Sequence, residues 1–187
     1  ISYFNKAVVE RRIGEIKPSK EWTDEILDWA QKRDLERPRK LNKTKGFEWL
    51  KCGEANGEII GGCLSSIVYL IGTEYWPDHQ NKILFIEIPE GEEFGKGKPL
   101  AEVDAQLCVL EIAGVFSQIK GLIVGRPFKY SEEEEKKFKE VILDNTRDYS
   151  FPILYGADIG HTDPQITIPL GSIAKINSKI NLFKLIY

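Results

Sequence analysis

The chain has 187 residues, of which 42% are hydrophobic and 29% are charged, and its formal net charge is −3. This length and hydrophobic content support one sizeable core, with or without an extended appendage, and leave little room for two full domains. The weak negative charge gives no reason to expect nucleic acid or an anionic membrane as a partner, and no apolar run approaches the roughly 20 residues of a membrane-spanning helix.

The cysteines, histidines and first residues give further expectations. The chain has three cysteines, an odd number, and none of them has C-x-x-C spacing; they are Cys52, Cys63 and Cys108. This pattern argues against a disulfide framework and a structural zinc site, and it favours a reducing, cytoplasmic compartment. His79 and His161 are not in a zinc-binding arrangement, so we expect no metal site. The chain opens with Ile rather than Met and has no signal-peptide pattern. We therefore expect that it was cut from a longer polypeptide or a fusion.

Residues 1–45 have a different pattern from the rest of the chain. A short strand is predicted for residues 6–16 and a helix for residues 23–33. The helix prediction depends on larger side chains that recur at helical spacing, namely Trp22, Ile26, Trp29 and Arg33. Residues 33–46 are polar and aperiodic, which is typical of a linker. A nucleic-acid-binding segment is a weaker alternative, because acidic residues dilute its charge and no aromatic residues interleave for base stacking.

A compact pattern begins near residue 46. Residues 47–52 predict a strand, and the dipeptide Asn56-Gly57 predicts a hairpin turn leading to a short strand over 58–60. The glycine turn GGCLSS then leads into a helix that reaches about residue 71.

An alternating series of strands and helices follows. The predicted elements are a strand at 82–88, a helix at 99–117, a strand at 122–125, a helix at 131–145 and a strand at 151–155. Ser131 and Glu134 form a capping-box pattern at the start of the last helix. The strands at 82–88 and 151–155 are almost entirely apolar, as expected when helices cover both faces of a parallel sheet. Residues 165–187 alternate and carry turn signals, so we expect an α/β domain with a parallel βαβαβ core and an added antiparallel layer.

Glu87 and His161 are candidate catalytic residues. Glu87 ends the apolar run KILFIEI, on the face of Ile83 and Phe85, where an unpaired carboxylate would be costly. His161 follows the apolar run FPILYGADIG, so both side chains are expected at the carboxyl edge of the sheet. A carboxylate that accepts from one imidazole nitrogen leaves the other nitrogen free as a general base. A structural pairing of Glu87 with Arg126 or a lysine, and a histidine bound only to backbone, stay open.

Four stretches of the sequence resemble the LD-carboxypeptidase and microcin C self-immunity family of serine peptidases. They are GGCLSSIVYLIGTEYWPD (61–78), ILFIE (83–87), GVFSQIKGLIVGR (114–126) and GADIGHTDPQITIPLG (156–171). The resemblance implies a swivelling β/β/α-type domain. It also implies that residues 1–45 are an interdomain connecting segment and that residues 46–187 are the carboxy-terminal domain of the peptidase.

In that family the glutamate of the ILFIE-like strand and the histidine of the GHT turn belong to a Ser-His-Glu triad, which maps onto Glu87 and His161. The family's nucleophilic serine lies in a preceding amino-terminal domain, so the resemblance implies that this chain lacks the nucleophile, needs that domain as its partner and is inactive alone. The implied reaction is hydrolysis of an amide bond next to a free carboxylate, without metal or organic cofactor. A non-catalytic binding or dimerisation module is the alternative, and homodimers are also implied.

The resemblance leaves two substrate classes open, a muropeptide and a peptidyl-nucleotide of the microcin C type. The early segment KPSKEWTDEILDW resembles the self-immunity branch more closely. Trp29, or Trp22, is therefore a candidate for stacking a nucleobase, with helix packing as the alternative. Trp76 and Arg126 are further candidates for contact with the substrate. Relatives tend to have Asn where this chain has Cys63, which puts the usual polar contact of that turn in doubt.

Overall fold

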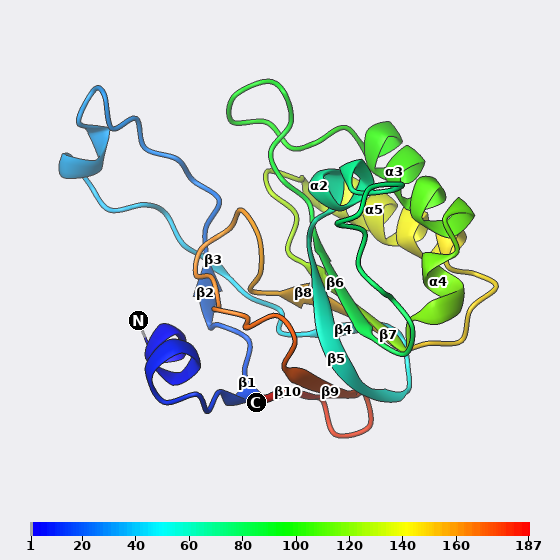
Figure 1. Ribbon diagram of the computed structural model, residues 1–187. Coiled ribbons are helices and arrows are strands. Elements are labelled where there is room, and N and C mark those ends of the chain that lie inside the picture. The colour runs from blue at the N-terminus through cyan, green and yellow to red at the C-terminus, as the bar shows by residue number, and fades with distance from the viewer. Residues whose placement is uncertain (1) are drawn as a thin grey trace.

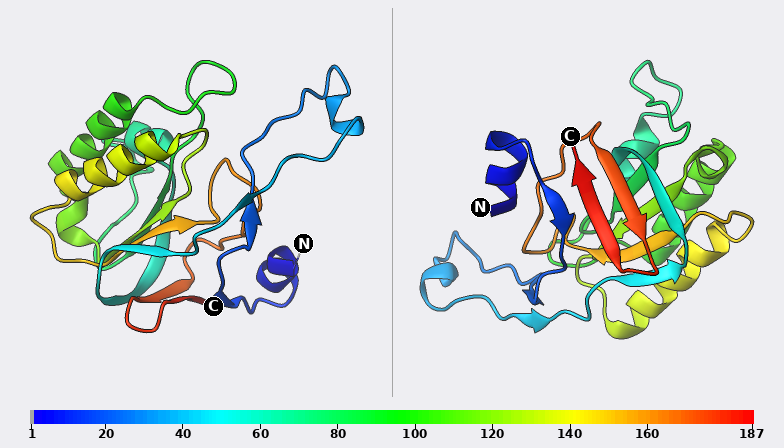
Figure 2. Two further views of the ribbon diagram at one scale, coloured as in Figure 1. Left: turned by 180° about the vertical axis from the view of Figure 1, so that it is seen from behind. Right: turned by 90° about the horizontal axis from the view of Figure 1, so that it is seen from below.

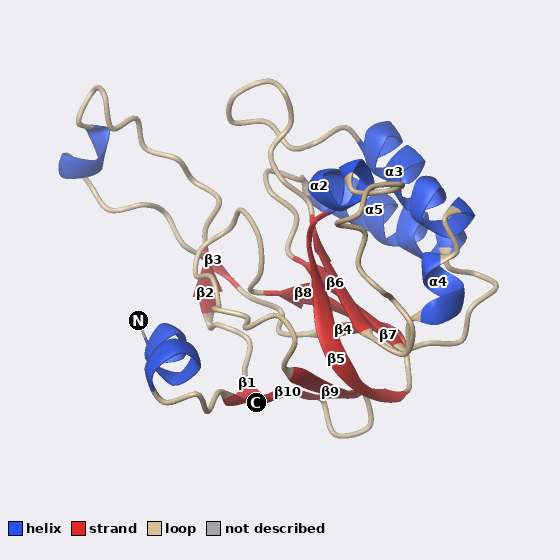
Figure 3. Ribbon diagram, in the orientation of Figure 1, coloured by secondary structure: helices blue, strands red, loops and turns tan. Residues whose placement is uncertain are grey.

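A mixed eight-stranded sheet forms the centre of the molecule (Figures 1 and 3). The structure is a computed structural model that describes residues 2–187. The strands of this sheet are β1 (Gly14–Ile16), β4 (Glu48–Lys51), β5 (Glu54–Cys63), β6 (Ile83–Glu87), β7 (Gly121–Gly125), β8 (Ile153–Ala157), β9 (Ile173–Asn177) and β10 (Leu182–Ile186). Their order is β1-β10-β9-β5-β6-β7-β8-β4, and β5 through β8 are parallel. The predicted α/β fold with a parallel core and an antiparallel layer is confirmed.

The two faces of the parallel strands are covered differently (Figures 1 and 2). One face packs against four helices, which are α2 (Leu64–Tyr69), α3 (Leu100–Ile112), α4 (Val115–Gln118) and α5 (Glu132–Asn145). The other face packs against β9, β10 and β1, together with the helical turns α1 (Ser2–Phe4) and η1 (Asn5–Val9). The expectation of helices on both faces of the sheet was wrong, because antiparallel strands bury the second face.

Strand β6 shows how this arrangement orients Glu87. Leu84 and Ile86 belong to the hydrophobic cluster under the helices, whereas Ile83 and Phe85 belong to the cluster under the antiparallel strands. Full burial of each such side chain contributes about 1.5–3 kcal/mol, so the register of β6 is strongly fixed. Because side chains alternate along a strand, Glu87 faces the side of Ile83 and Phe85, as predicted.

Local residues set the start of α5 and the boundary between α3 and α4. The Ser131 side chain accepts a hydrogen bond from the Glu134 backbone N–H, and the Glu134 side chain accepts from the Ser131 N–H, which confirms the predicted capping box. The single helix predicted for residues 99–117 is divided into α3 and α4, because Gly114 adopts a left-handed conformation with φ 76°. Of the helices within residues 2–187, none is long and apolar enough to cross a bilayer.

The predicted hairpin at Asn56-Gly57 is wrong. Both residues lie inside β5, which pairs with β9 through residues 54–58 and with β6 through residues 59–63. A Cβ atom on Gly57 would lie 2.5 Å from the backbone oxygen of Asn81, so glycine is needed there for close approach of the backbone. Gly57 therefore serves the close approach of β5 to the segment that precedes β6, and not a turn.

The amino-terminal region also differs from its predictions. Residues 6–16 form a π-helical turn and then β1, which pairs with β10. The helix predicted for 23–33 is absent: residues 24–41 form an irregular arm with one 3₁₀ turn, η2 (Arg33–Leu35). This arm projects from the body between β2 (Glu21–Trp22) and β3 (Asn42–Lys43), which pair with each other (Figure 1). Of the predicted stripe, Ile26 is 44% exposed and Trp29 is 80% exposed, so these side chains are not packed as a helix face would be.

Candidate active site

Glu87 and His161 meet at the carboxyl edge of the parallel strands. Glu87 is the last residue of β6, and His161 lies in the turn that follows β8. The His161 Nδ1 atom is 2.8 Å from Glu87 Oε2, a good hydrogen-bond distance. The side chain of Glu87 is 9% exposed, whereas that of His161 is 44% exposed. A buried carboxylate thus lies behind an imidazole that solvent reaches.

This geometry assigns the tautomer of His161. A carboxylate accepts hydrogen bonds, so Nδ1 carries the hydrogen and donates it to Glu87. In the neutral imidazole, Nε2 then carries the lone pair, and within residues 2–187 the ring forms no other hydrogen bond. The pair can therefore accept a proton from a hydroxyl group brought to Nε2, which is the chemistry of a general base.

Gly160 allows the turn to approach Glu87 closely. Its backbone has φ 104°, a conformation that favours glycine. A Cβ atom at this position would lie 2.8 Å from both Cβ and Oε2 of Glu87. Since any larger residue would push the turn away from Glu87, the hydrogen bond between Glu87 and His161 depends on this glycine.

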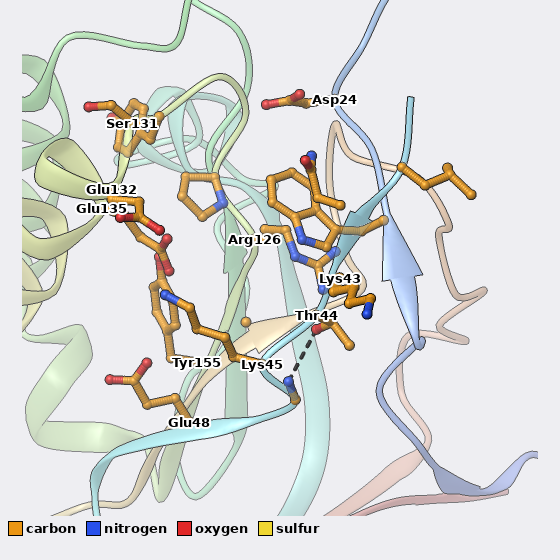
Figure 4. Close-up of a pocket in the computed structure, with 17 residues that line it drawn as sticks. Asp24, Lys43, Thr44, Lys45, Glu48, Arg126, Ser131, Glu132, Glu135 and Tyr155 are labelled. Carbon is orange, nitrogen blue, oxygen red and sulfur yellow. Dashed lines mark hydrogen bonds between the residues drawn. The ribbon is translucent and has the colours of Figure 1, made fainter. Parts of the chain in front are cut away.

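Arg126 lies near the pair but binds a different carboxylate. Its Nη2 atom is 2.8 Å from Asp158 Oδ1, and its guanidinium carbon is 4.8 Å from the centre of the Trp22 ring. Both charged residues are almost completely buried. Arg126 lines a cavity of about 610 Å³, and Figure 4 shows its side chain among the other lining residues. The alternative in which Glu87 pairs with Arg126 is therefore wrong, while contact of Arg126 with substrate stays a prediction.

A second cavity, of about 570 Å³, brings His161 together with Trp29. It is bordered by Phe128 on the body and by several residues of the arm. Within the arm, Arg37 makes two hydrogen bonds to Glu25, of 2.7 and 2.9 Å. Hydrogen bonds from the Arg37 side chain and the Lys40 N–H lower the pKa of Glu25 to about 2, so this carboxylate is charged at neutral pH. The pair ties the two halves of the arm together beside the cavity.

The sequence model of the LD-carboxypeptidase C-terminal domain matches residues 56–176. The chain belongs to this family. The matched range contains Glu87, Arg126 and His161 and extends from β5 to β9. The family resemblance inferred from the four sequence stretches is thereby confirmed.

Relatives of this LD-carboxypeptidase domain are similar over most of its length. The microcin C7 self-immunity protein MccF of Escherichia coli is 30% identical over 152 residues, which are 80% of this chain and 42% of that protein. The putative carboxypeptidase YocD of Bacillus subtilis is 30% identical over 164 residues, 88% of this chain and 47% of that protein. A solved MccF-like protein from Streptococcus pneumoniae in complex with AMP has a TM-score of 0.83 at 28% identity, covering 100% of this chain and 57% of its own. The chain thus spans about half the length of these relatives.

Trp76 and Cys63 occupy different places in the LD-carboxypeptidase domain. Trp76 packs against the cluster under the helices and lies 4.6 Å, between ring centres, from His79. It does not border the cavity beside His161, and its contact with substrate stays a prediction. Cys63 ends β5 and pairs in register with Glu87 on β6, so it lies directly beside this carboxylate.

Asp158 and Ser19 were not among the sequence-based candidates. Asp158 binds Arg126 and also accepts hydrogen bonds from Ser19, which lies 139 residues earlier in the chain. A charged residue directly after the apolar strand β8 was the available signal for Asp158, whereas the sequence around Ser19 contains none. Within residues 2–187, His, Cys, Asp and Glu side chains form no group of three or more that could hold a metal ion.

Proposed function

We propose that Glu87 and His161 are two members of a Ser-His-Glu triad, and that the protein hydrolyses an amide bond next to a free carboxylate. The observation that carries this proposal is the 2.8 Å hydrogen bond from His161 Nδ1 to Glu87 Oε2 at the carboxyl edge of the sheet. Membership of the LD-carboxypeptidase family and the carboxypeptidase names of relatives support the same reaction class.

In this proposal the nucleophilic serine comes from an amino-terminal domain of the same protein, and residues 1–45 connect that domain to residues 46–187. His161 Nε2 removes the serine proton as the hydroxyl oxygen attacks the substrate carbonyl, and the imidazolium then protonates the leaving amine. Water, deprotonated by the same nitrogen, hydrolyses the resulting ester and regenerates the serine. Glu87 keeps Nδ1 protonated and stabilises the imidazolium that forms.

For the substrate we propose a peptidyl-nucleotide, with a muropeptide as the other class. Support comes from Trp29, whose exposed indole borders the same cavity as His161. An aromatic side chain in this position offers a surface on which a nucleobase can stack. The relatives are consistent with this choice, since one is a microcin C7 self-immunity protein and another was solved in complex with AMP.

The test is kinetic and uses the full-length protein that carries this chain. Glu87→Gln and His161→Ala are each expected to lower kcat at least about a thousandfold with the fold retained, whereas the exposed Glu92→Gln serves as a matched control without effect. The 187-residue chain alone is expected to show no turnover. Wild-type rates in both site variants would end the assignment. Failure of the full-length protein to hydrolyse either substrate class would favour a non-catalytic binding or dimerisation module.

A further inference from the structure

The turn that carries His161 is anchored by the residues on either side of the histidine. The imidazole itself is 44% exposed, whereas Asp158 is 3% exposed and Thr162 is 1% exposed. An imidazole that is open to solvent gains little from its own packing. Its position beside Glu87 therefore follows from the position of the turn.

Asp158 anchors the beginning of this turn to a distant segment. Its Oδ2 atom accepts a hydrogen bond of 2.7 Å from the Ser19 backbone N–H. Its Oδ1 atom accepts one of 2.9 Å from the Ser19 hydroxyl and one of 2.8 Å from Arg126 Nη2. Both carboxylate oxygens are used, so the side chain of Asp158 has little freedom to move without breaking several charge-assisted bonds.

Arg126 and Thr23 bind the two residues that follow His161 in the turn. Arg126 Nη1 reaches Thr162 Oγ1 at 3.4 Å, directly after His161 in the chain. The backbones of Thr23 and Asp163 exchange two hydrogen bonds of 2.8 Å each. Residues 19–23 thus follow the turn from Asp158 to Asp163, and the same segment continues into the arm that carries Trp29.

We propose that Asp158 is a positioning residue for His161. Ser19 and Arg126 bind Asp158 and thereby hold the turn where the imidazole meets Glu87. Because residues 19–23 belong to the connecting segment and are bonded to this turn, the position of that segment also sets the position of His161. This proposal rests on the proposed function of Glu87 and His161. It adds that the orientation of His161 is set by Asp158 and Ser19, neither of which forms a hydrogen bond with the imidazole.

The kinetic test uses Asp158→Asn in the full-length protein. Because small displacements of a catalytic group cost about 100-fold in rate, we expect kcat to fall by about that factor while KM changes little. Ser19→Ala should lower kcat less, and Ser19→Thr, which restores the hydroxyl, should regain the wild-type rate. The matched control is Ser172→Ala, which removes a serine hydroxyl bonded at 2.8 Å to Pro169 O, away from this turn, and should leave kcat unchanged.

A spectroscopic test separates this proposal from the proposed function. The protein is labelled with ¹⁵N-histidine, and the downfield NMR resonance of the His161 Nδ1–H reports the hydrogen bond to Glu87. This resonance is assigned by its loss in His161→Gln. The resonance of His79 serves as an internal reference. We expect Asp158→Asn, or Ser19→Ala if the first variant does not fold, to weaken the His161 signal without moving that of His79. An unchanged His161 signal together with wild-type kcat would overturn the positioning role. Activity retained in Glu87→Gln and His161→Ala would instead overturn the proposed chemistry, whatever the His161 signal shows.

Discussion

Gly160 provides a single-residue test of the geometry at the proposed site. We expect Gly160→Ala to lower kcat/KM about 100-fold or more, because the added methyl group would lie 2.8 Å from Glu87 Oε2 and displace the turn. The matched control is Gly72→Ala. Gly72 also has a positive φ, of 80°, but its methyl group would meet no atom within 4 Å. Equal activity losses in both variants would show that backbone strain, rather than contact with Glu87, is responsible.

His79 predicts an acid-sensitive contribution to stability. It is buried against Trp76, and within the described residues its Nε2 atom has no hydrogen-bond partner. Burial lowers the pKa of His79 from its ordinary value of 6.5. The unfolded chain therefore binds more protons at this residue than the folded chain as the pH falls through about 6.5, and the free energy of unfolding decreases.

The variant His79→Leu removes this titration. Urea unfolding at about pH 7.5 and about pH 5.5 should show a smaller acid-induced loss of stability in the variant than in the wild type. The comparison within each protein cancels the effect of the leucine on packing. Identical losses in the two proteins would mean that protonation of His79 is not linked to folding.

At the scale of single elements, α5 owes part of its stability to the capping box. The Ser131 hydroxyl accepts a hydrogen bond of 3.3 Å from the Glu134 N–H. Ser131→Ala should decrease the free energy of unfolding by about 1 kcal/mol, measured as a shift of the urea midpoint. Ser66→Ala, at an exposed position inside α2, is the matched control and should change it little. A shift no larger than that of the control would contradict the role of the cap.

The elements that sequence patterns predicted are those whose signals are local. Strands β6 and β8 are almost entirely apolar, apart from Glu87 at the end of β6, because both faces are covered, and α5 begins at its capping box. Glu87 and His161 were predicted by the rule that functional groups of parallel sheets lie at the carboxyl ends of the strands. Their mutual hydrogen bond follows from that placement.

The elements that were predicted wrongly depend on partners far away in the sequence. Asn56-Gly57 is a hairpin signal by itself, but pairing with both β9 and β6 holds these residues in one extended strand. The side chains at helical spacing around Trp29 stay largely exposed, and isolated short helices are marginal in water. Likewise, nothing near Asp158 in sequence indicates that Ser19 binds it.

At the scale of the whole molecule, the arm and the carboxyl edge of the sheet line one cavity. The arm extends away from the sheet (Figure 2), yet its residues and His161 border the same cavity. Residues 19–23 anchor the base of the arm on the turn of His161. A substrate bound beside His161 would therefore contact a segment that lies far before His161 in the sequence.

This arrangement predicts that Trp29 affects one substrate class and spares the other. Stacking of a nucleobase on an aromatic side chain contributes about 1–3 kcal/mol, so Trp29→Ala should raise KM for a peptidyl-adenylate by about tenfold with little change in kcat. Turnover of a muropeptide, which has no nucleobase, should be unaffected. The control is Leu35→Ala, since Leu35 lies in the same arm, is 78% exposed and does not border the cavity. Equal effects of Trp29→Ala on both substrates would place the nucleobase elsewhere and favour a muropeptide as the substrate.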